Sequence, residues 1–444
     1  MDLEGKSVLV LGLGVSGRSA ADFCAARGAR VVAADERPAA ALAGLDALDP
    51  RVERVLGRPF PDPAAFDLVV PSPGVPGERY RGRARRIAGD VELAGRALRV
   101  PIVAVTGTNG KSTTTALCEA MLCAAGLRAR AAGNLGDPAL GLVGEPLDVA
   151  VLELSSFQLE TTESFRPAVA VILNATPDHL DRHGSFEAYV EAKARILAHQ
   201  RREDAAVLNF EDPVVRGLAE RVRGRLLPFA RSGPLDAGGW LDAGALVLRQ
   251  GVAARRIPLE DMALAGAHNR ENALAALLAA SALGADPLRA ARALATFRGL
   301  PHRAEVVARR QGVTWVNDSK ATNPGAALRA LLGFPAPIVW IAGGRDKGLD
   351  MSELAEAASG RVRAALLIGE AADKLGTALA GRADLHRAAS LEEAVERAAG
   401  LARPGDTVLL APACASQDQF RDFAERGERF RAAVARLAAG EEPR

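Results

Sequence analysis

The segment 105–114, Val-Thr-Gly-Thr-Asn-Gly-Lys-Ser-Thr-Thr, has the residue types and spacing most suggestive of chemistry. The apolar run 100–105 leads into it and predicts a buried strand, and helical spacing of apolar residues follows it. A glycine-rich turn between strand and helix presents backbone N–H groups and the positive helix end to phosphate. Lys111 can reach the outer phosphates, and the hydroxyl of Ser112 or Thr113 can reach magnesium. The segment therefore predicts a phosphate-binding loop rather than an incidental turn.

A carboxylate is expected beside this loop. Glu153 lies near the end of the apolar run 149–154, which predicts another strand. In open α/β sheets, ligands bind at the carboxyl ends of the strands. A carboxylate placed there can hold magnesium directly or through water. The alternative, a solvated acid at a strand end, is less compatible with a neighbouring phosphate loop.

The segment 178–183, Asp-His-Leu-Asp-Arg-His, contains two histidines four residues apart. On a helix this spacing resembles a zinc-binding pair. Pro177 and Gly184 argue against a helix here. A histidine near magnesium, or one that contacts a substrate phosphate or carboxylate, fits the segment better than zinc.

Lysine is rare in this chain, which makes each lysine informative. Only six of the 56 basic residues are lysine and the other 50 are arginine. Arginine cannot replace lysine where a compact charge or a titratable amine is needed. Four of the six lie in motif-like surroundings, namely Lys111, Lys193, Lys320 and Lys347.

Lys193 falls within the apolar stripe of a helix predicted over 186–199. Burial of an ammonium group lowers its pKa. A neutral amine can react with carbon dioxide to form a carbamate, an anionic oxygen ligand for a hard cation. Alternatively, the side chain can extend its ammonium group to water at the edge of the stripe. Helix geometry alone leaves both alternatives open.

The N-terminal part has a second glycine-rich turn. A strand at 7–11 precedes Gly12-x-Gly14-x-x-Gly17, and a second strand, 31–34, leads to Asp35. This arrangement is typical of a dinucleotide-binding fold. A nicotinamide or flavin cofactor is one possibility, although an argument from fold alone is weak.

The C-terminal part places polar loops after several predicted strands. The strands 313–316, 337–342 and 407–410 are followed by the loops 317–324, 343–347 and 412–416. Asp318 can bind a ribose or a magnesium-bound water, and Lys320 a phosphate. His302 and Arg303 add charge near the start of this part. Together the loops predict one binding edge.

Composition favours a soluble multidomain protein. The 444 residues are 49% apolar and 25% charged, with a net charge of +2. We expect two or three domains, and the charge indicates neither nucleic acid nor membrane as a partner. The four cysteines lack metal-type spacing, and no apolar run reaches transmembrane length. A cytoplasmic location with free thiols is expected.

Alternating strands and helices predict an α/β fold with three domains. Residues 1–97 form a Rossmann-like domain that precedes the phosphate loop. Residues 98–298 form a central P-loop ATPase-like domain with a parallel sheet and a small β excursion at 233–251. Residues 299–444 form a second Rossmann-like α/β domain.

Taken together, these residues resemble the Mur ligase family, the ATP-dependent amide-bond ligases of peptidoglycan assembly. Thr106–Ser112 resembles the family's ATP loop, and Pro301-His302-Arg303 its hinge arginine. The segment 268–272, His-Asn-Arg-Glu-Asn, resembles its nucleotide motif. Glu153, Asp178-His179 and Lys193 resemble its magnesium site, in which the lysine is carbamylated. The resemblance covers essentially the whole chain.

The resemblance implies ATP and two magnesium sites as cofactors, with Lys193 carbamylated. The implied ATP-binding residues are Gly107, Thr108, Asn109, Gly110, Lys111, Ser112, Thr113, Asn269, Asn272, Arg303 and Asp318. The implied metal ligands are Ser112, Glu153, His179 and Lys193. The implied catalytic residues are Lys111, Glu153, His179, Lys193 and Lys320.

Within the family, the segments 152–159, 317–323 and 416–420 are most similar to the members that add D-glutamate to UDP-N-acetylmuramoyl-L-alanine. No Asp-Asn-Pro-Arg segment is present, which counts against the members that add a diamino acid. The implied D-glutamate-binding residues are Thr322, Lys347, Ser416 and Phe423. By the same resemblance the first domain binds UDP instead of a dinucleotide, through Val15, Ser16, Asp35, Glu36, Arg37, Ser72, Pro73 and Gly74, with Asn134 near the sugar-peptide part.

Three alternatives remain. The chain can be another Mur-type ligase, or a folylpolyglutamate synthase with the same mechanism. It can be a nicotinamide-dependent oxidoreductase with an appended ATPase, or a non-enzymatic nucleotide-binding module. The expected partners are small-molecule substrates only, and a monomer is expected.

Overall fold

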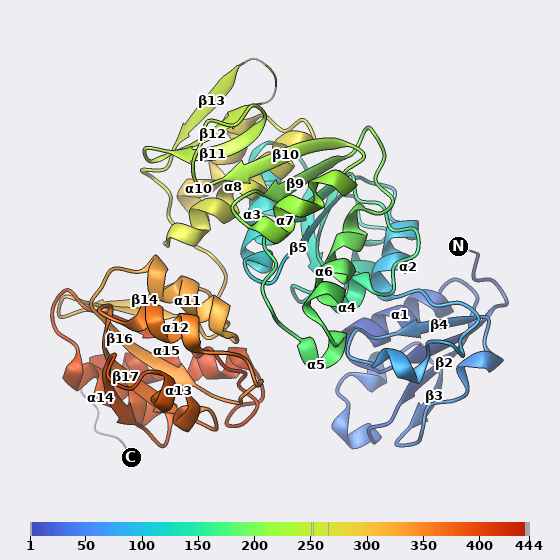
Figure 1. Cartoon of the computed structure of the whole chain (residues 1–444). Coiled ribbons are helices and arrows are strands. Elements are labelled where there is room, and N and C mark those ends of the chain that lie inside the picture. The colour runs from blue at the N-terminus through green and yellow to red at the C-terminus, as the bar shows by residue number, and fades with distance from the viewer. Residues whose placement is uncertain (1, 250, 252, 265, 440–444) are drawn as a thin grey trace. The chain divides into compact units, whose positions relative to one another are not determined.

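The computed structural model describes residues 2–249, 251, 253–264 and 266–439. Three β-sheets with flanking helices follow one another along the chain (Figure 1). The chain divides into two compact units, Met1–Glu260 with Ala273–Ala293, and Asp261–Asn272 with Leu294–Arg444. The α/β class with three sheets is confirmed. The domain boundaries at residues 97/98 and 298/299 stay predictions.

The first sheet is parallel, with the strand order β3-β2-β1-β4. Its strands are β1 (Ser7–Leu11), β2 (Arg30–Asp35), β3 (Glu53–Leu56) and β4 (Leu68–Pro71). Helix α1 (Val15–Ala25) follows β1, and α2 (Asp90–Ala97) follows the sheet. The strand order reverses between β1 and β4, and ligands of doubly wound folds bind at such a switch point. The Gly12 and Ser72 turns both lie there.

The second sheet has the order β13-β12-β11-β10-β9-β8-β5-β7-β6. Its parallel part comprises β5 (Ile102–Thr106), β6 (Ala129–Gly133), β7 (Val149–Glu153), β8 (Val169–Ile172), β9 (Ala205–Asn209) and β10 (Arg225–Ala230). The β excursion expected at 233–251 is confirmed as β11 (Gly238–Asp242) and β12 (Ala245–Arg249), and it extends beyond the predicted range to β13 (Ala254–Pro258). These three strands are joined to each other by antiparallel pairing. Because β5 lies between β7 and β8, the loop before α3 (Lys111–Ala124) has a strand end on either side.

The third sheet has the order β14-β15-β19-β16-β17-β18, and only its β14–β15 pair is antiparallel. The strands are β14 (Glu305–Arg310), β15 (Val313–Asn317), β16 (Ile338–Gly343), β17 (Val362–Ile368), β18 (Asp384–Arg387) and β19 (Thr407–Leu410). Along β16, Trp340 packs with α11 (Pro324–Gly333), α12 (Ser352–Ala358) and α13 (Ala372–Ala378). Ile341 packs on the opposite face with α14 (Leu391–Leu401) and α15 (Phe423–Ala439). Helices therefore cover both faces of this sheet.

Two helix predictions are wrong in detail. The helix expected over 186–199 is α6 (Phe186–Ala194), and a 3₁₀ turn, Arg195–Leu197, follows it. The segment 178–183, expected to be non-helical, contains one helical turn, α5 (Leu180–His183). Gly184, with φ of 79°, ends this turn instead of preventing it. The long helix expected near 269–283 is present as α8 (Ala267–Ala282).

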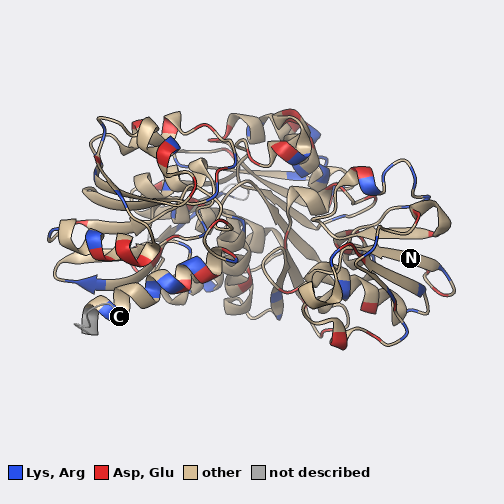
Figure 2. Cartoon of the chain, turned by 90° about the horizontal axis from the view of Figure 1, so that it is seen from below, with Lys and Arg blue, Asp and Glu red and all other residues tan. Residues whose placement is uncertain are grey.

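Charged residues of both signs are interspersed along the chain (Figure 2), in agreement with the small net charge. Within the described part of the chain, no helix combines the length and apolar character needed to span a membrane.

Candidate active site

The phosphate loop between β5 and α3 has a backbone that requires glycine. Gly107 and Gly110 have φ angles of 151° and 85°, which L side chains rarely adopt. The loop is anchored on Asn174, just beyond β8, whose Oδ1 accepts from Asn109 N at 2.8 Å and whose carbonyl accepts from Thr108 N at 3.0 Å. The Lys111 ammonium donates to Gly107 O at 3.0 Å and to Thr108 O. A positive charge therefore lies over the start of α3, where phosphate would bind.

Glu153 meets this loop from the neighbouring strand. It is the last residue of β7 and its relative exposure is 1%. The Ser112 hydroxyl donates to Glu153 Oε2, and Asn134 Nδ2 donates to Oε1 at 2.7 Å. A serine hydroxyl and a buried carboxylate are hard oxygen donors, which fit magnesium. The structure thus brings together the predicted residues Ser112, Glu153 and Asn134.

Lys193 of α6 is buried against the same loop. Its relative exposure is 2%, and its ammonium donates to Gly107 O at 2.8 Å and lies 4.4 Å from the centre of the Tyr189 ring. Burial lowers the pKa of Lys193 well below its usual value, and the nearby Lys111 lowers it further, although Asp178 and Glu153 oppose the shift. The alternative in which the ammonium reaches water is wrong.

The two histidines of segment 178–183 do not act as a pair. His179 has φ of 53°, and its side chain is 41% exposed and lies 3.8 Å from Asp178. The His183 side chain is only 2% exposed, with Nε2 at 2.9 Å from Ser156 Oγ and Nδ1 at 3.1 Å from Glu160. Among the described residues, no group of three or more His, Cys, Asp and Glu side chains is arranged to hold a metal. His179 is therefore the one of the two that can turn toward a ligand.

The turn that was expected to bind UDP lies where the carboxyl ends of β1, β2 and β4 meet. Asp35 Oδ2 accepts from Leu13 N at 2.8 Å, and its carboxylate also binds Arg37. Although burial opposes it, these bonds from Arg37 and Leu13 lower the pKa of Asp35 to about 2. Ser72 Oγ donates to Gly12 O at 2.7 Å, which joins the two turns. These contacts order the backbone of both turns, where backbone N–H groups can bind a phosphate-bearing ligand.

The remaining predicted residues of this turn lie close to it in the chain. The Val15 side chain is 54% exposed, and Ser16 hydrogen bonds to the buried Asp90. Glu36 pairs with Arg79 at 3.0 Å. Pro73 and Gly74 belong to the turn after β4, and Gly74 has open space at its Cβ position.

Sequence reasoning missed Arg182 and Asn174. Arg182 Nη2 donates to Val75 O at 2.9 Å, so it joins the segment after β8 to the turn after β4. Arg182 lies between the two histidines of the segment 178–183, and this position could have marked it as a candidate site residue. Asn174 directly follows the apolar run 169–173, so it could have been recognised as a polar residue at the carboxyl end of a strand, where ligands bind in such sheets.

In the C-terminal unit, the loops expected to share one edge do so, and ligand binding at this edge stays a prediction. The neighbouring parallel strands β15, β19 and β16 end at the same edge. Hydrogen bonds join their loops, from Gly343 N to Pro412 O at 2.8 Å, from Ala413 N to Ala321 O at 2.9 Å, and from Arg345 N to Ala415 O at 2.9 Å.

Several predicted ligand-binding residues lie along this edge. Asp318 Oδ1 accepts from Ala304 N at 3.2 Å, and Lys320 N donates to His302 O at 3.1 Å. The Lys320 ammonium lies 3.7 Å from the centre of the Phe423 ring. The Asn272 side chain donates to Asn269 Oδ1 at 3.0 Å. The remaining predicted residues of this unit are Arg303, Thr322, Lys347 and the buried Ser416.

Asp318 supports a prediction about stability. Burial raises its pKa from 3.8 to about 6, although the Ala304 bond and Arg303 oppose the shift. Because the folded-state pKa exceeds the unfolded value, ionisation destabilises the fold progressively from about pH 4 to pH 6, by at most about 3 kcal/mol. Asp318→Asn is therefore expected to raise the Tm of the C-terminal unit at pH 8, with little change at pH 4.

Scanning calorimetry at the two pH values measures this effect. Asp35→Asn is the matched control, because the pKa of Asp35 is lowered and its replacement should reduce stability at pH 8. An Asp318→Asn variant with unchanged or lower Tm at pH 8 would contradict the prediction.

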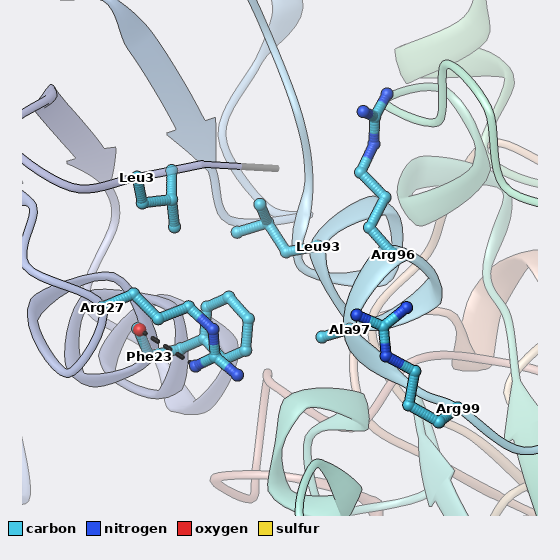
Figure 3. Close-up of a pocket in the computed structure, with 7 residues that line it drawn as sticks. All are labelled: Leu3, Phe23, Arg27, Leu93, Arg96, Ala97 and Arg99. Atoms are coloured by element: carbon cyan, nitrogen blue, oxygen red, sulfur yellow. Dashed lines mark hydrogen bonds between the residues drawn. The ribbon is translucent and has the colours of Figure 1, made fainter.

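A separate cavity of about 130 Å³ lies between α1 and α2 (Figure 3). Its lining residues are Leu3, Phe23, Arg27, Leu93, Arg96, Ala97 and Arg99. None of the predicted site residues lines it, and its volume is below the range of ordinary ligand pockets.

Comparison with known proteins identifies relatives for every part of the chain. Residues 6–87 match the Mur ligase MurD-like N-terminal domain, residues 105–280 the Mur ligase middle domain, and residues 302–414 the Mur ligase glutamate ligase domain. Two similar proteins are named UDP-N-acetylmuramoylalanine–D-glutamate ligase. The one from Geobacter metallireducens is 46% identical, with 100% of each chain covered. The one from Anaeromyxobacter dehalogenans is 47% identical, with 97% of each covered.

Solved structures share the fold at low identity. A pseudomurein peptide ligase type C from Methanothermus fervidus has a TM-score of 0.63 at 18% identity, covering 98% of this chain and 100% of that one. UDP-N-acetylmuramate-alanine ligase from Thermotoga maritima has a TM-score of 0.61 at 19% identity, with the same coverage. The domain matches and the full-length relatives together show that the chain belongs to the Mur ligase family.

Proposed function

We propose that this protein is an ATP-dependent ligase that joins D-glutamate to UDP-N-acetylmuramoyl-L-alanine in peptidoglycan precursor synthesis. The observation that supports ligase chemistry is the phosphate loop joined to Glu153 through Ser112 and to Lys193 through Gly107. The choice of substrates is supported by the shared name of the two relatives at 46% and 47% identity, UDP-N-acetylmuramoylalanine–D-glutamate ligase.

The chemistry requires activation of a carboxylate, because hydroxide is a poor leaving group. Transfer of the γ-phosphoryl group of ATP to the L-alanine carboxylate forms an acyl phosphate and ADP. The D-glutamate amine then attacks the acyl carbon, and phosphate leaves as the amide forms. Lys111 and Lys320 would offset the repulsion between the two anions and stabilise the transition state. No side-chain nucleophile is required.

The phosphate loop also has residues that fit a divalent cation. Ser112, Glu153 and His179 would hold magnesium, which when bound supplies positive charge to the phosphate oxygens. A second ion would be held with the help of a carbamate on Lys193. The buried amine with a lowered pKa favours that modification, because the neutral form reacts with carbon dioxide.

The other predicted residues are assigned to substrates by the same proposal. The turn around Asp35 and Ser72 would bind the UDP part, with Asn134 near the sugar-peptide part. Thr322, Lys347, Ser416 and Phe423 would bind D-glutamate. Asn269, Asn272, Arg303 and Asp318 would complete the ATP site. We further propose that the protein acts as a monomer in the cytoplasm, where ATP and UDP-linked precursors are available.

The decisive experiment measures phosphate release from ATP with UDP-N-acetylmuramoyl-L-alanine and a panel of D- and L-amino acids. We expect release with D-glutamate and not with L-glutamate or L-lysine. Activity with L-glutamate or L-lysine but not D-glutamate would favour another Mur-type ligase or a folylpolyglutamate synthase. NADH binding that UDP does not displace would favour the oxidoreductase, and no ATP turnover with all substrates present would favour a binding module.

A further inference from the structure

Arg426 is a fully buried arginine that the proposed mechanism does not use. It lies in the first turn of α15, and its relative exposure is 0%. Burial lowers the pKa of Arg426 to about 10, so its guanidinium remains charged at neutral pH. The side chain therefore keeps a positive charge inside the C-terminal unit.

The hydrogen-bond acceptors of this guanidinium are all uncharged oxygens. Nε donates to Ser319 Oγ at 3.0 Å and Nη2 to Ser319 O at 2.9 Å. Both terminal nitrogens donate to Cys414 O at 3.3 Å, and Nη1 also donates to Ala415 O at 3.3 Å and Gly343 O at 3.5 Å. Within the described residues, no carboxylate lies within ion-pair distance of Arg426. An apolar side chain of similar size would avoid the cost of burying this charge, so its presence suggests a use.

These acceptors lie on three different strand-end loops. Ser319 follows β15, Gly343 ends β16, and Cys414 and Ala415 follow β19. The approach is close, because a Cβ on Gly344 would lie 3.1 Å from Arg426 Nη1 and 2.2 Å from Ala415 O. A planar guanidinium with five fixed donors can join three loops, whereas a lysine ammonium has only three donors around one atom.

The same loops contain the residues proposed to bind the amino acid. Ser416 directly follows Ala415, which Arg426 holds. Ser319 Oγ, which accepts from Arg426, donates to Phe423 O at 2.8 Å. Lys320 follows Ser319, and its ammonium lies on the Phe423 ring. Arg426 is thus one contact away from Ser416, Phe423 and Lys320.

We propose that Arg426 is a positioning residue for the amino-acid half of the site. It aligns the three loops, and its positive charge, which Asp418 stabilises from beyond ion-pair distance, attracts an incoming amino acid with two carboxylates. This inference rests on the proposed function. It predicts that loss of the guanidinium weakens use of the amino acid without weakening use of the UDP substrate.

The test is steady-state phosphate release by full-length Arg426→Lys and Arg426→Gln, with each substrate varied in turn. Small displacements of binding groups have large kinetic effects, so we expect the KM for D-glutamate to rise about tenfold in Arg426→Lys. Arg426→Gln, which also loses the charge, should show a larger rise. The KM for the UDP substrate should stay within about twofold in both variants, because its proposed turn lies in the other unit.

Arg429→Lys is the matched control on the same helix. Arg429 lies one turn further along α15, and its side chain is 43% exposed and paired with Glu392 at 2.8 Å. Arg429 shares none of the hydrogen-bond acceptors of Arg426, and apart from Glu392 its guanidinium lies 5.0 Å from the centre of the Phe420 ring. Because it does not join the three loops through Ser319, Gly343 and Cys414, all three KM values should match those of the unmodified protein.

Two results would overturn the inference. One is an Arg426→Lys protein with an unchanged KM for D-glutamate. The other is an equal change in all three KM values together with a lowered Tm, which indicates a purely structural role. If Arg426→Lys and Arg426→Gln do not fold, Ser319→Ala replaces them, because it removes only the hydroxyl between Arg426 and Phe423. An unchanged KM for D-glutamate in that variant would also overturn the inference.

Failure of the proposed function gives a different result. If the unmodified protein uses another amino acid, the substrate assignment fails, and the same KM comparison is made with that amino acid. A selective KM rise would then retain the positioning role of Arg426 without D-glutamate as the substrate.

Discussion

Replacement of Lys111 by alanine is expected to reduce ATP-dependent phosphate release by about 10³-fold, the cost of removing one essential charge-stabilising donor. The Lys111 ammonium lies over the phosphate loop, bonded to Gly107 O and Thr108 O. Binding of ATP would exchange these carbonyls for phosphate oxygens. Without Lys111, the negative charge that develops during phosphoryl transfer is no longer stabilised by an ammonium group at the phosphate loop.

Binding of the UDP substrate should change little in Lys111→Ala. The turn proposed to hold UDP is built from Asp35, Leu13 and Ser72 at the strand ends of the first sheet, whereas Lys111 begins the helix that follows β5 of the second sheet. Phosphate release is measured by a coupled assay, and UDP-substrate affinity by calorimetry. Lys6→Ala, which removes an exposed lysine, is the control. Unchanged turnover in Lys111→Ala would place the ATP site elsewhere.

Replacement of Lys193 by alanine is expected to reduce activity by a similar factor, on the order of 10³-fold, through loss of a ligand and of charge stabilisation. Loss of activity alone does not identify a carbamate, because Lys193 also donates to Gly107 O and supports the phosphate loop. The informative result is rescue. A short carboxylic acid such as formate or acetate fits the space left by the side chain and supplies the missing carboxylate oxygens.

The rescue experiment compares Lys193→Ala with Lys193→Met, which fills the same space with an apolar chain. Acetate or formate should restore part of the activity in Lys193→Ala and none in Lys193→Met. Chloride at equal ionic strength controls for salt effects. An active alanine variant, or an inactive one that neither acid rescues, would remove the carbamate from the proposal.

Much of the fold was predictable because its signals are local. Buried parallel strands contain continuous apolar runs such as 149–152 and 169–172, and the phosphate loop combines glycines with Lys111 and Ser112. Local signals failed at 178–183, where Gly184 was taken to prevent a helix and instead ends a single turn. His183 differs from His179 because its ring contacts Ser156 and Glu160, which lie more than 20 residues before His183 in the chain.

The sequence by itself determined the three α/β parts, the phosphate loop and the polar strand ends, because periodicity and turn residues act over a few neighbouring positions. Only the tertiary structure decided which of these groups meet. It placed Asn134 and Ser112 on the two oxygens of Glu153, buried the amine of Lys193 against Gly107, and put Arg426 among three loops. Such contacts depend on strand order and helix packing, which bring together residues that are far apart in the chain and that no local pattern pairs.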